Sequence, residues 1–157
     1  MNTLKVKRTS ERGILPVRAN SNDAGLDLFC PVRCVIAPYS SELISFDIAI
    51  ELAPNTVGLI YARSSIGGKH GIRPRNCVGV IDEKYRDSLL MVVENSSTVH
   101  YAIERGDRIA QLVITPVLYP EVVEVDELDH TDDRGGGYGS TEAKVFKKFG
   151  IEFPVKE

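Results

Sequence analysis

Between Glu42 and Leu52, large apolar side chains fall on every second position from Ile44 onward. The apolar members are Ile44, Phe46, Ile48, Ile50 and Leu52. Successive side chains of a β-strand point to opposite faces, so this alternation predicts a strand with one buried face. A chain that carries such a run must build at least part of its core from a sheet.

Further short apolar or β-branched runs lie at residues 57–61, 77–81, 88–94, 98–103, 109–115 and 122–126. Pro, Gly, Asn or Asp bounds each of them, and most prolines fall between the runs, where a missing donor does no harm to a ladder. No segment shows a convincing helical stripe. The sequence therefore predicts an all-β domain, either a sandwich, a jelly roll or a barrel.

Length and composition limit the classes of function. The 157 residues fit one domain that can bury a core without metal or disulfide staples. The net charge of -3 lacks the basic excess of duplex-binding proteins, so nucleic acid is not an expected partner. No apolar stretch approaches a membrane span, and the first residues lack the apolar run of a signal peptide. A cytoplasmic location without membrane attachment is expected.

Three cysteines, Cys30, Cys34 and Cys77, cannot all pair within one chain. In a reducing compartment they serve as small buried apolar residues. The spacing of Cys30 and Cys34 is compatible with zinc, but no matching His/Cys pair follows elsewhere. The structural interpretation is favoured.

Polar clusters lie where predicted strands begin or end. In residues 23–28, Asp27 is either a turn cap or a group that faces a metal–phosphate complex. Residues 62–71 follow the run at 57–61 and offer a cation, paired hydroxyls and backbone N–H groups, the inventory that a polyphosphate requires. An ordinary Ser/Gly turn has the same composition. His70 is expected to be a surface histidine.

Two further clusters follow. Residues 76–86 form a strand that turns at residues 82–84 and returns at Ser88, which predicts a hairpin. Within it Gly79 allows the close approach of a flat ligand, and the Tyr85 ring can form one wall of a binding site. Asp82, at the turn, can act as a base. In residues 105–112 the turn leads into a strand with one isolated amide, Gln111, which needs hydrogen-bond partners if it is buried.

The last cluster is the glycine run of residues 134–141, which holds one Arg, one Tyr and adjacent Ser and Thr hydroxyls. Glycines bring bare N–H groups close to an anion, and the Arg and the hydroxyls add donors, so the run suits a phosphate clamp. It is not a Walker loop, since no Lys precedes Ser140 and no helix is expected after the turn. A solvated, flexible tail is the alternative.

In this order and at these intervals, the five clusters resemble the five motifs of the trimeric dUTP diphosphatases (dUTPases). Residues 24–28 match Ala-Gly-x-Asp-Leu, residues 63–67 match Arg-Ser-x-x-Gly, and residues 79–86 match Gly-Val-Ile-Asp-x-x-Tyr-Arg. Gly-Asp-Arg-Ile-Ala-Gln-Leu is complete at residues 106–112. The glycine run matches the closing motif, with Tyr138 in place of the usual Phe. The resemblance covers nearly all of the chain from residue 24 to residue 141.

Four features depart from the family pattern. Lys84 replaces a small polar residue, and Asp87-Ser88 replace the usual pair after Tyr-Arg. The glycine motif is one residue shorter between Arg134 and the aromatic residue. Glu142 replaces the usual Gly, and a tail follows it to Glu157, for which no role is assigned.

The resemblance implies a jelly-roll-like β-barrel that forms homotrimers, with each site drawing the hairpin from one chain and the glycine arm from another. It places a single jelly-roll domain at residues 1–133 and assigns the arm and tail, residues 134–157, to the same domain. The implied reaction is the hydrolysis of dUTP to dUMP and pyrophosphate, which limits uracil in DNA and supplies dUMP for dTMP synthesis.

The resemblance also implies a role for each matching residue. Asp82 orients and deprotonates a water for in-line attack at the α-phosphorus, and Mg²⁺ is held mainly by the triphosphate, with Asp27 reaching its waters only. The phosphate-binding residues are Arg63, Ser64, Ser65, Gly67, Gln111, Arg134, Gly139, Ser140 and Thr141. The residues that bind uracil and deoxyribose are Asn76, Val78, Gly79, Ile81, Tyr85 and Tyr138.

Two other functions remain open. The related dCTP deaminases share the fold and an Arg-Ser-Ser motif, but they carry a catalytic Glu where this chain has Val92. A non-catalytic trimeric regulatory protein on the same fold is the second alternative, for which Lys84, Asp87 and the tail are the main arguments.

Overall fold

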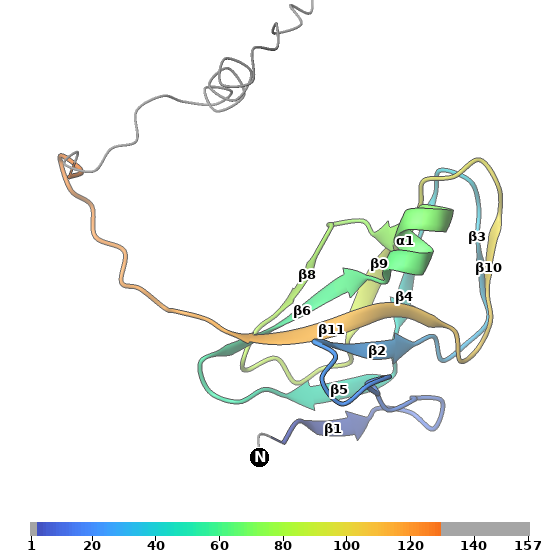
Figure 1. Cartoon of the computed structure of the whole chain (residues 1–157), viewed down its shortest axis with the longest axis horizontal. Coiled ribbons are helices and arrows are strands. Elements are labelled where there is room, and N and C mark those ends of the chain that lie inside the picture. Colours follow the sequence, from blue (N-terminus) through green and yellow to red (C-terminus); the bar gives the residue numbers. More distant parts are fainter. Residues whose placement is uncertain (1–2, 130–157) are drawn as a thin grey trace, which may run out of the picture. The chain divides into compact units, whose positions relative to one another are not determined.

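The structure is a computed structural model that describes residues 3–129. Eleven strands and one short helix make up the described part of the chain, so the prediction of an all-β chain is confirmed. By its contacts the chain divides into two compact units, Met1–Tyr119 and Pro120–Glu157. All of the helices and strands of the described residues lie in the first unit (Figure 1). The predicted boundary at residue 133 lies outside the described residues and stays a prediction.

The strands form four sheets. A four-stranded sheet has the order β2 (Gly25–Phe29), β11 (Arg108–Pro116), β6 (Thr56–Ala62) and β8 (Gly79–Ile81). A three-stranded sheet contains β4 (Ser41–Ser45), β9 (Leu90–Asn95) and β7 (Ile72–Pro74). Two ribbons complete the fold, one of β1 (Lys5–Arg8) with β5 (Ile48–Glu51) and one of β3 (Cys34–Ile36) with β10 (Tyr101–Ile103). Every strand pairing is antiparallel.

The buried side chains are mostly aliphatic and come from both larger sheets and both ribbons. Phe46, Ile36, Ile60, Leu89, Val93, Ile103 and Leu112 are completely inaccessible to solvent. Cys30 also belongs to this core, and burial raises the pKa of its thiol to about 11. It is therefore a neutral apolar residue at physiological pH, as expected for a structural cysteine. Burial was expected for all three cysteines, but Cys34 is only partly buried and Cys77 is exposed, so the expectation is wrong for Cys77. None of the helices in residues 3–129 is long and apolar enough to cross a membrane.

The alternating run at residues 42–52 is buried as predicted, but it forms two strands in place of one. The chain breaks at Asp47, which adopts a left-handed conformation with φ of 54°. Its carboxylate accepts hydrogen bonds from Ser10 at 2.7 Å, Ser45 at 2.8 Å and Arg12 at 3.1 Å. Desolvation opposes the ionised form, yet the Ser10 and Ser45 hydrogen bonds and the Arg12 charge lower the pKa of Asp47. A satisfied Asp is thus the point where the run passes from one sheet to another.

Gly13, in the N-terminal loop, packs closely against the backbone of Asp47. A Cβ atom at this position would overlap the Asp47 carbonyl oxygen, which the Thr9 N–H already holds at 2.9 Å. We expect Gly13→Ala to lower the free energy of unfolding by about 1–3 kcal/mol, because the backbone must shift. Thermal and urea denaturation measure the change. Gly68→Ala is the matched control, since a Cβ atom there would meet no heavy atom within 4 Å and alanine favours helices; equal stability of the two variants would contradict the expected clash.

Two other predictions about secondary structure are wrong. Residues 64–70 were expected to lie in a loop, but Ser64–His70 form the helix α1, in which the Ile66 side chain is buried. Residues 122–126 were expected to be a strand, but they form none, and Val122, Val123 and Val125 are exposed. For α1, burial of Ile66 decides the outcome, which a single sequence does not display. Residues 122–126 pair with no strand in the described part of the chain.

Candidate functional site

A polar cavity of about 310 Å³ gathers residues from three of the sequence clusters. Its lining consists of Ala19, Asp23, Ala24, Gly25, Asp27, Arg63, Ser64 and Gln111. We call it the phosphate cavity, because its cation, hydroxyl and amide are donors that suit phosphate oxygens. Its wall is formed by residues that are far apart in the chain.

Strand pairing explains this convergence. β11 runs between β2 and β6 (Figure 1), and in its register Gln111 lies opposite Asp27 on one side and Tyr61 on the other. Arg63 follows the end of β6 and precedes α1. The antiparallel order β2-β11-β6 therefore places three predicted site residues, Asp27, Arg63 and Gln111, on one wall.

Asp27 is the electrostatic centre of that wall. One carboxylate oxygen lies 2.7 Å from Arg63 Nε, and the other lies 3.0 Å from Arg108 Nη1. The Asp27 side chain is only 12% exposed, so its charge is poorly solvated and is balanced by the two guanidinium groups. Both oxygens are engaged by arginines, and Asp27 thus orients cations at the cavity in addition to any role toward Mg²⁺ waters.

Arg108 is a functional candidate that the sequence reasoning did not assign. It lies in the Gly-Asp-Arg motif, which could have indicated a functional arginine. Only the structure shows that Arg108 and Arg63 both pair with Asp27. The Arg63 guanidinium also reaches the Arg108 carbonyl oxygen at 3.5 Å. The three side chains form one connected group beside the cavity.

Gln111 has the partner that a buried amide requires. Its Nε2 donates to the Ala62 carbonyl oxygen at 3.0 Å, which confirms the expectation from the sequence. Gly25 is necessary for this arrangement, since a Cβ atom there would lie 2.5 Å from Gln111 Oε1. Contacts with β2 and β6 fix the orientation of the amide. Such a fixed orientation suits a donor that binds a ligand from one direction.

The helix α1 presents Ser64 and Ser65 at its first turn, and both are exposed. The Gly67 N–H donates to the Arg63 carbonyl oxygen at 2.8 Å, and its predicted contact with phosphate stays a prediction. A Cβ atom at this glycine would lie 3.1 Å from the Ala62 Cβ atom. The observed function of Gly67 is close packing of the helix on β6.

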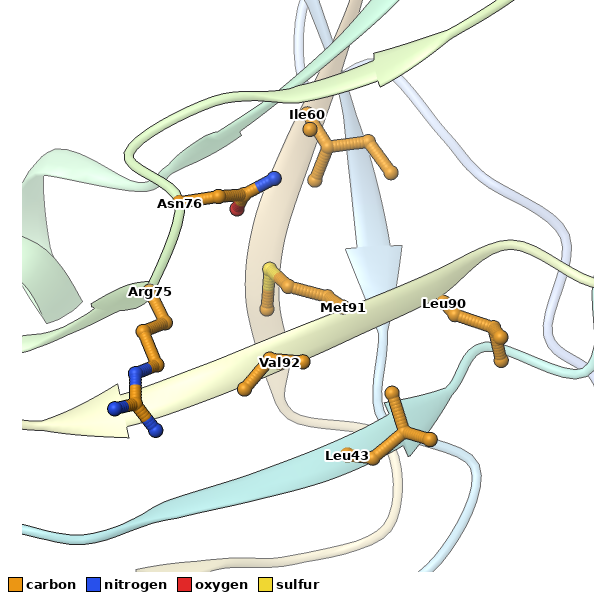
Figure 2. Close-up of a pocket in the computed structure, with 8 residues that line it drawn as sticks. Leu43, Ile60, Arg75, Asn76, Leu90, Met91 and Val92 are labelled. Atoms are coloured by element: carbon orange, nitrogen blue, oxygen red, sulfur yellow. The ribbon is translucent and has the colours of Figure 1, made fainter.

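A second, mainly apolar cavity of about 550 Å³ opens between the two larger sheets. We call it the intersheet cavity; its lining is Leu43, Ile60, Arg75, Asn76, Gly79, Leu90, Met91 and Val92. Figure 2 shows Asn76 above the opening and Met91 and Val92 on β9 below it. Of the predicted nucleoside residues, Asn76 and Gly79 line this cavity. Val78 lies between them, while Ile81 is largely buried.

The predicted hairpin at residues 76–88 is wrong. β8 pairs with β6 and β9 pairs with β4 and β7, so the turn after Ile81 connects two different sheets. Gly79 also has a structural role, since a Cβ atom there would lie 3.2 Å from the Ile60 Cβ atom. Because the two strands do not close on each other, they leave the intersheet cavity between them.

Asp82 begins the turn between β8 and β9 and is exposed. It lines a third cavity of about 480 Å³ together with Asn55, Glu83, Lys84 and Tyr119. Tyr85 is partly buried against the core, and its hydroxyl donates to the Ser88 carbonyl oxygen at 2.9 Å. Asp82 lines neither the phosphate cavity nor the intersheet cavity, so the structure of one chain keeps the predicted base and the phosphate ligands in separate places.

The remaining predicted residues, Arg134, Tyr138, Gly139, Ser140 and Thr141, lie outside the described residues. Within residues 3–129, no group of three or more His, Cys, Asp or Glu side chains is arranged to hold a metal ion.

Comparisons with known proteins give one consistent result. A family model described as dUTPase matches residues 11–142. The deoxyuridine 5'-triphosphate nucleotidohydrolase of Hydrogenobaculum sp. is 44% identical over 142 residues, which cover 90% of this chain and 99% of that protein.

Solved structures agree with the sequence comparisons. The dUTPase of Staphylococcus bacteriophage 80alpha with dUPNHPP has a TM-score of 0.83 and 30% identity, covering 89% of this chain and 98% of its own. A mutant dUTPase from phage phi11 of S. aureus, solved with a structural Mg(II) ion, has a TM-score of 0.75 and 29% identity over 80% of this chain and 98% of its own.

Proposed function

This chain belongs to the dUTPase family, and from that premise we propose that it divides the hydrolysis of dUTP between two half-sites. The phosphate half-site is the phosphate cavity with Arg63, Ser64 and Gln111. The nucleoside half-site is the segment from Asn76 to Tyr85, which includes Asp82. The observation that carries the proposal is the convergence of a cation, a hydroxyl and an amide on one cavity while Asp82 lies apart.

The reaction gives dUMP and pyrophosphate by attack of water at the α-phosphorus. Asp82 orients the water and accepts its proton, which general-base catalysis requires within hydrogen-bond reach of the nucleophile. Arg63, Ser64 and Gln111 donate to phosphate oxygens and stabilise the charge that grows on the leaving pyrophosphate. Ser65 extends this set of donors from the exposed side of α1.

Mg²⁺, when bound together with the substrate, would supply charge neutralisation along the phosphates. The residues present fit this arrangement, since Asp27 and Asp23 line the phosphate cavity, where carboxylates can accept hydrogen bonds from metal-bound waters. Because Asp27 already balances Arg63 and Arg108, we assign it to water-mediated contact with the ion and to orientation of the two arginines.

Substrate selection belongs to the nucleoside half-site. We assign recognition of the uracil edge to backbone groups of Asn76, Val78 and Gly79, with Ile81 as support from the core. In the single chain the Val78 N–H donates to the Asn76 carbonyl oxygen at 2.7 Å, so these two groups must separate to bind a base. Cytosine would leave buried polar groups unpaired, a penalty that can exceed a thousandfold. Tyr85 is the wall against C2′ of the sugar, which excludes ribose. In the segment beyond the described residues, we assign Tyr138 to stacking on uracil and Arg134, Gly139, Ser140 and Thr141 to the terminal phosphates.

The two half-sites meet in a homotrimer. Within one chain Asp82 is not among the residues that line the phosphate cavity, which supports a site completed by half-sites of different chains. The exposed apolar residues Leu43, Leu90 and Val92 on neighbouring strands β4 and β9 offer a surface that such an assembly can bury. We place the trimer in the cytoplasm, where its three free cysteines remain reduced.

The release of pyrophosphate and dUMP from dUTP, measured with dCTP and UTP as parallel substrates, tests the proposed function. We expect dUTP to be hydrolysed in the presence of Mg²⁺, and dCTP and UTP to be poor substrates. Ammonia released from dCTP would identify a deaminase, although β9 carries Val92 where that family has its catalytic Glu. Binding of dUTP without turnover would identify a regulatory protein.

A further inference from the structure

The turn that presents Asp82 is tied to a distant part of the chain by the next residue, Glu83. We propose that Glu83 is a positioning residue for the reaction, whose carboxylate holds the Asp82 turn against Asn55 and Tyr119. This inference rests on the proposed role of Asp82 as the base.

The hydrogen bond from the Asn55 backbone N–H to Glu83 Oε2, at 2.8 Å, carries the inference. Asn55 lies between β5 and β6 in a left-handed conformation, with φ of 59°. Its carbonyl oxygen accepts a hydrogen bond from the Val117 N–H at 3.0 Å, just beyond β11. Glu83 therefore binds a turn that the four-stranded sheet already fixes.

Tyr119 supports the same carboxylate. It lines one cavity with Asp82 and Glu83. Desolvation raises the pKa of Tyr119, and the charges of Glu83 and Asp82 and a hydrogen bond with Glu83 raise it further. The protonated Tyr119 hydroxyl can therefore donate a hydrogen bond to the Glu83 carboxylate.

Besides the bond from Asn55 to Glu83, Tyr85 packs against the core, and the turn has few other hydrogen bonds to the rest of the described chain. Tyr85 N–H donates to the Asp82 carbonyl oxygen at 3.0 Å, and Arg86 donates to the Glu83 carbonyl oxygen at 2.6 Å. In the described part of the chain, the other hydrogen bonds of residues 82–87 stay within the turn or end at Ser88. Since Asp82 and Glu83 are adjacent, release of the Glu83 side chain frees the base to move. Misplacement of a reacting group by about 1 Å can lower a rate by about a hundredfold.

We expect Glu83→Ala to lower kcat by about tenfold while KM changes less than about twofold, because the phosphate and uracil contacts persist. Glu83→Gln keeps an oxygen that can accept from the Asn55 N–H, so it should retain at least about half of the wild-type kcat. Asn55→Gly keeps the N–H and permits the positive φ, and it should also remain active. Asp87→Ala removes an exposed acidic side chain from the same turn and is the charge-matched control.

The experiment measures kcat, KM and single-turnover rates for these four variants, with trimer content and melting temperature recorded for each. Wild-type kcat in Glu83→Ala overturns the inference, as does a Glu83→Gln variant that is as slow as Glu83→Ala. A rate loss that disappears after correction for folded trimer also overturns it, because the role is then merely structural. Asp82→Asn is run in parallel: if it retains turnover, the proposed base is wrong, whereas an inactive Asp82→Asn with unchanged Glu83→Ala refutes only the positioning role.

Discussion

Replacement of Asp82 by Asn is expected to lower the turnover of dUTP at least about a hundredfold, while dUTP still binds within severalfold of its wild-type affinity. The amide keeps the size of the carboxylate but cannot accept the proton of the attacking water. Affinity is preserved because the phosphate cavity and the intersheet cavity are unchanged. Single-turnover release of pyrophosphate and calorimetric binding of a non-hydrolysable dUTP analogue measure the two quantities separately.

Asp87→Asn is the control for this prediction, since it makes the same chemical change at an exposed position further along the turn. It should leave kcat near the wild-type value. Near-normal turnover in Asp82→Asn would remove this residue from the mechanism. A large loss of analogue binding would instead make Asp82 a binding residue.

Mixed trimers of two inactive variants should regain about a quarter of the wild-type activity. One variant is Asp82→Asn, and the other combines Arg63→Gln with Ser64→Ala, which removes the cation and the hydroxyl of the phosphate half-site. If the half-sites come from different chains, each is intact with a probability of about one half in an equal random mixture, so about one site in four is complete. The Gln side chain can still donate to Asp27, which limits the damage to the fold.

Co-refolding of the two variants, native mass spectrometry of the trimers and assay of dUTP hydrolysis perform this test. A mixture of Asp82→Asn with Asp82→Ala is the control, because no site in it contains the base and no activity should return. Absence of recovery in verified mixed trimers of the first pair would mean that one chain supplies both half-sites. The shared-site proposal would then be wrong, although the residue roles would stand.

The sequence identified which residues line the phosphate cavity more completely than it predicted their arrangement. Asp27, Arg63, Ser64 and Gln111 were found because each motif is local and carries an unusual combination of polar groups. Their convergence depends on the pairing of β11 with both β2 and β6, which a linear pattern does not contain. The role of Arg108 was missed for this reason, since its partner Asp27 is 81 residues away in the chain.

Errors about the fold have similar physical causes. The apolar alternation around Asp47 gave no sign of a break, because the break depends on hydrogen bonds from Ser10 and Arg12 in the N-terminal loop. The helix α1 contains two glycines, a composition that predicts a turn, but burial of Ile66 and the fit of Gly67 against Ala62 stabilise it. A hairpin was expected from the turn at Asp82, yet sheet pairing separates its two strands.

That separation has a consequence for how substrate preference can change. The intersheet cavity has Ile60 of one sheet and Met91 of the other on its sides, so its width depends on how the two sheets pack. A methylene added or removed in the hydrophobic interior moves those sheets, because protein interiors are densely packed. Selection for a larger or smaller base can therefore act on aliphatic residues that never touch the nucleotide, and variants with altered base preference should include substitutions behind the cavity as well as on its surface.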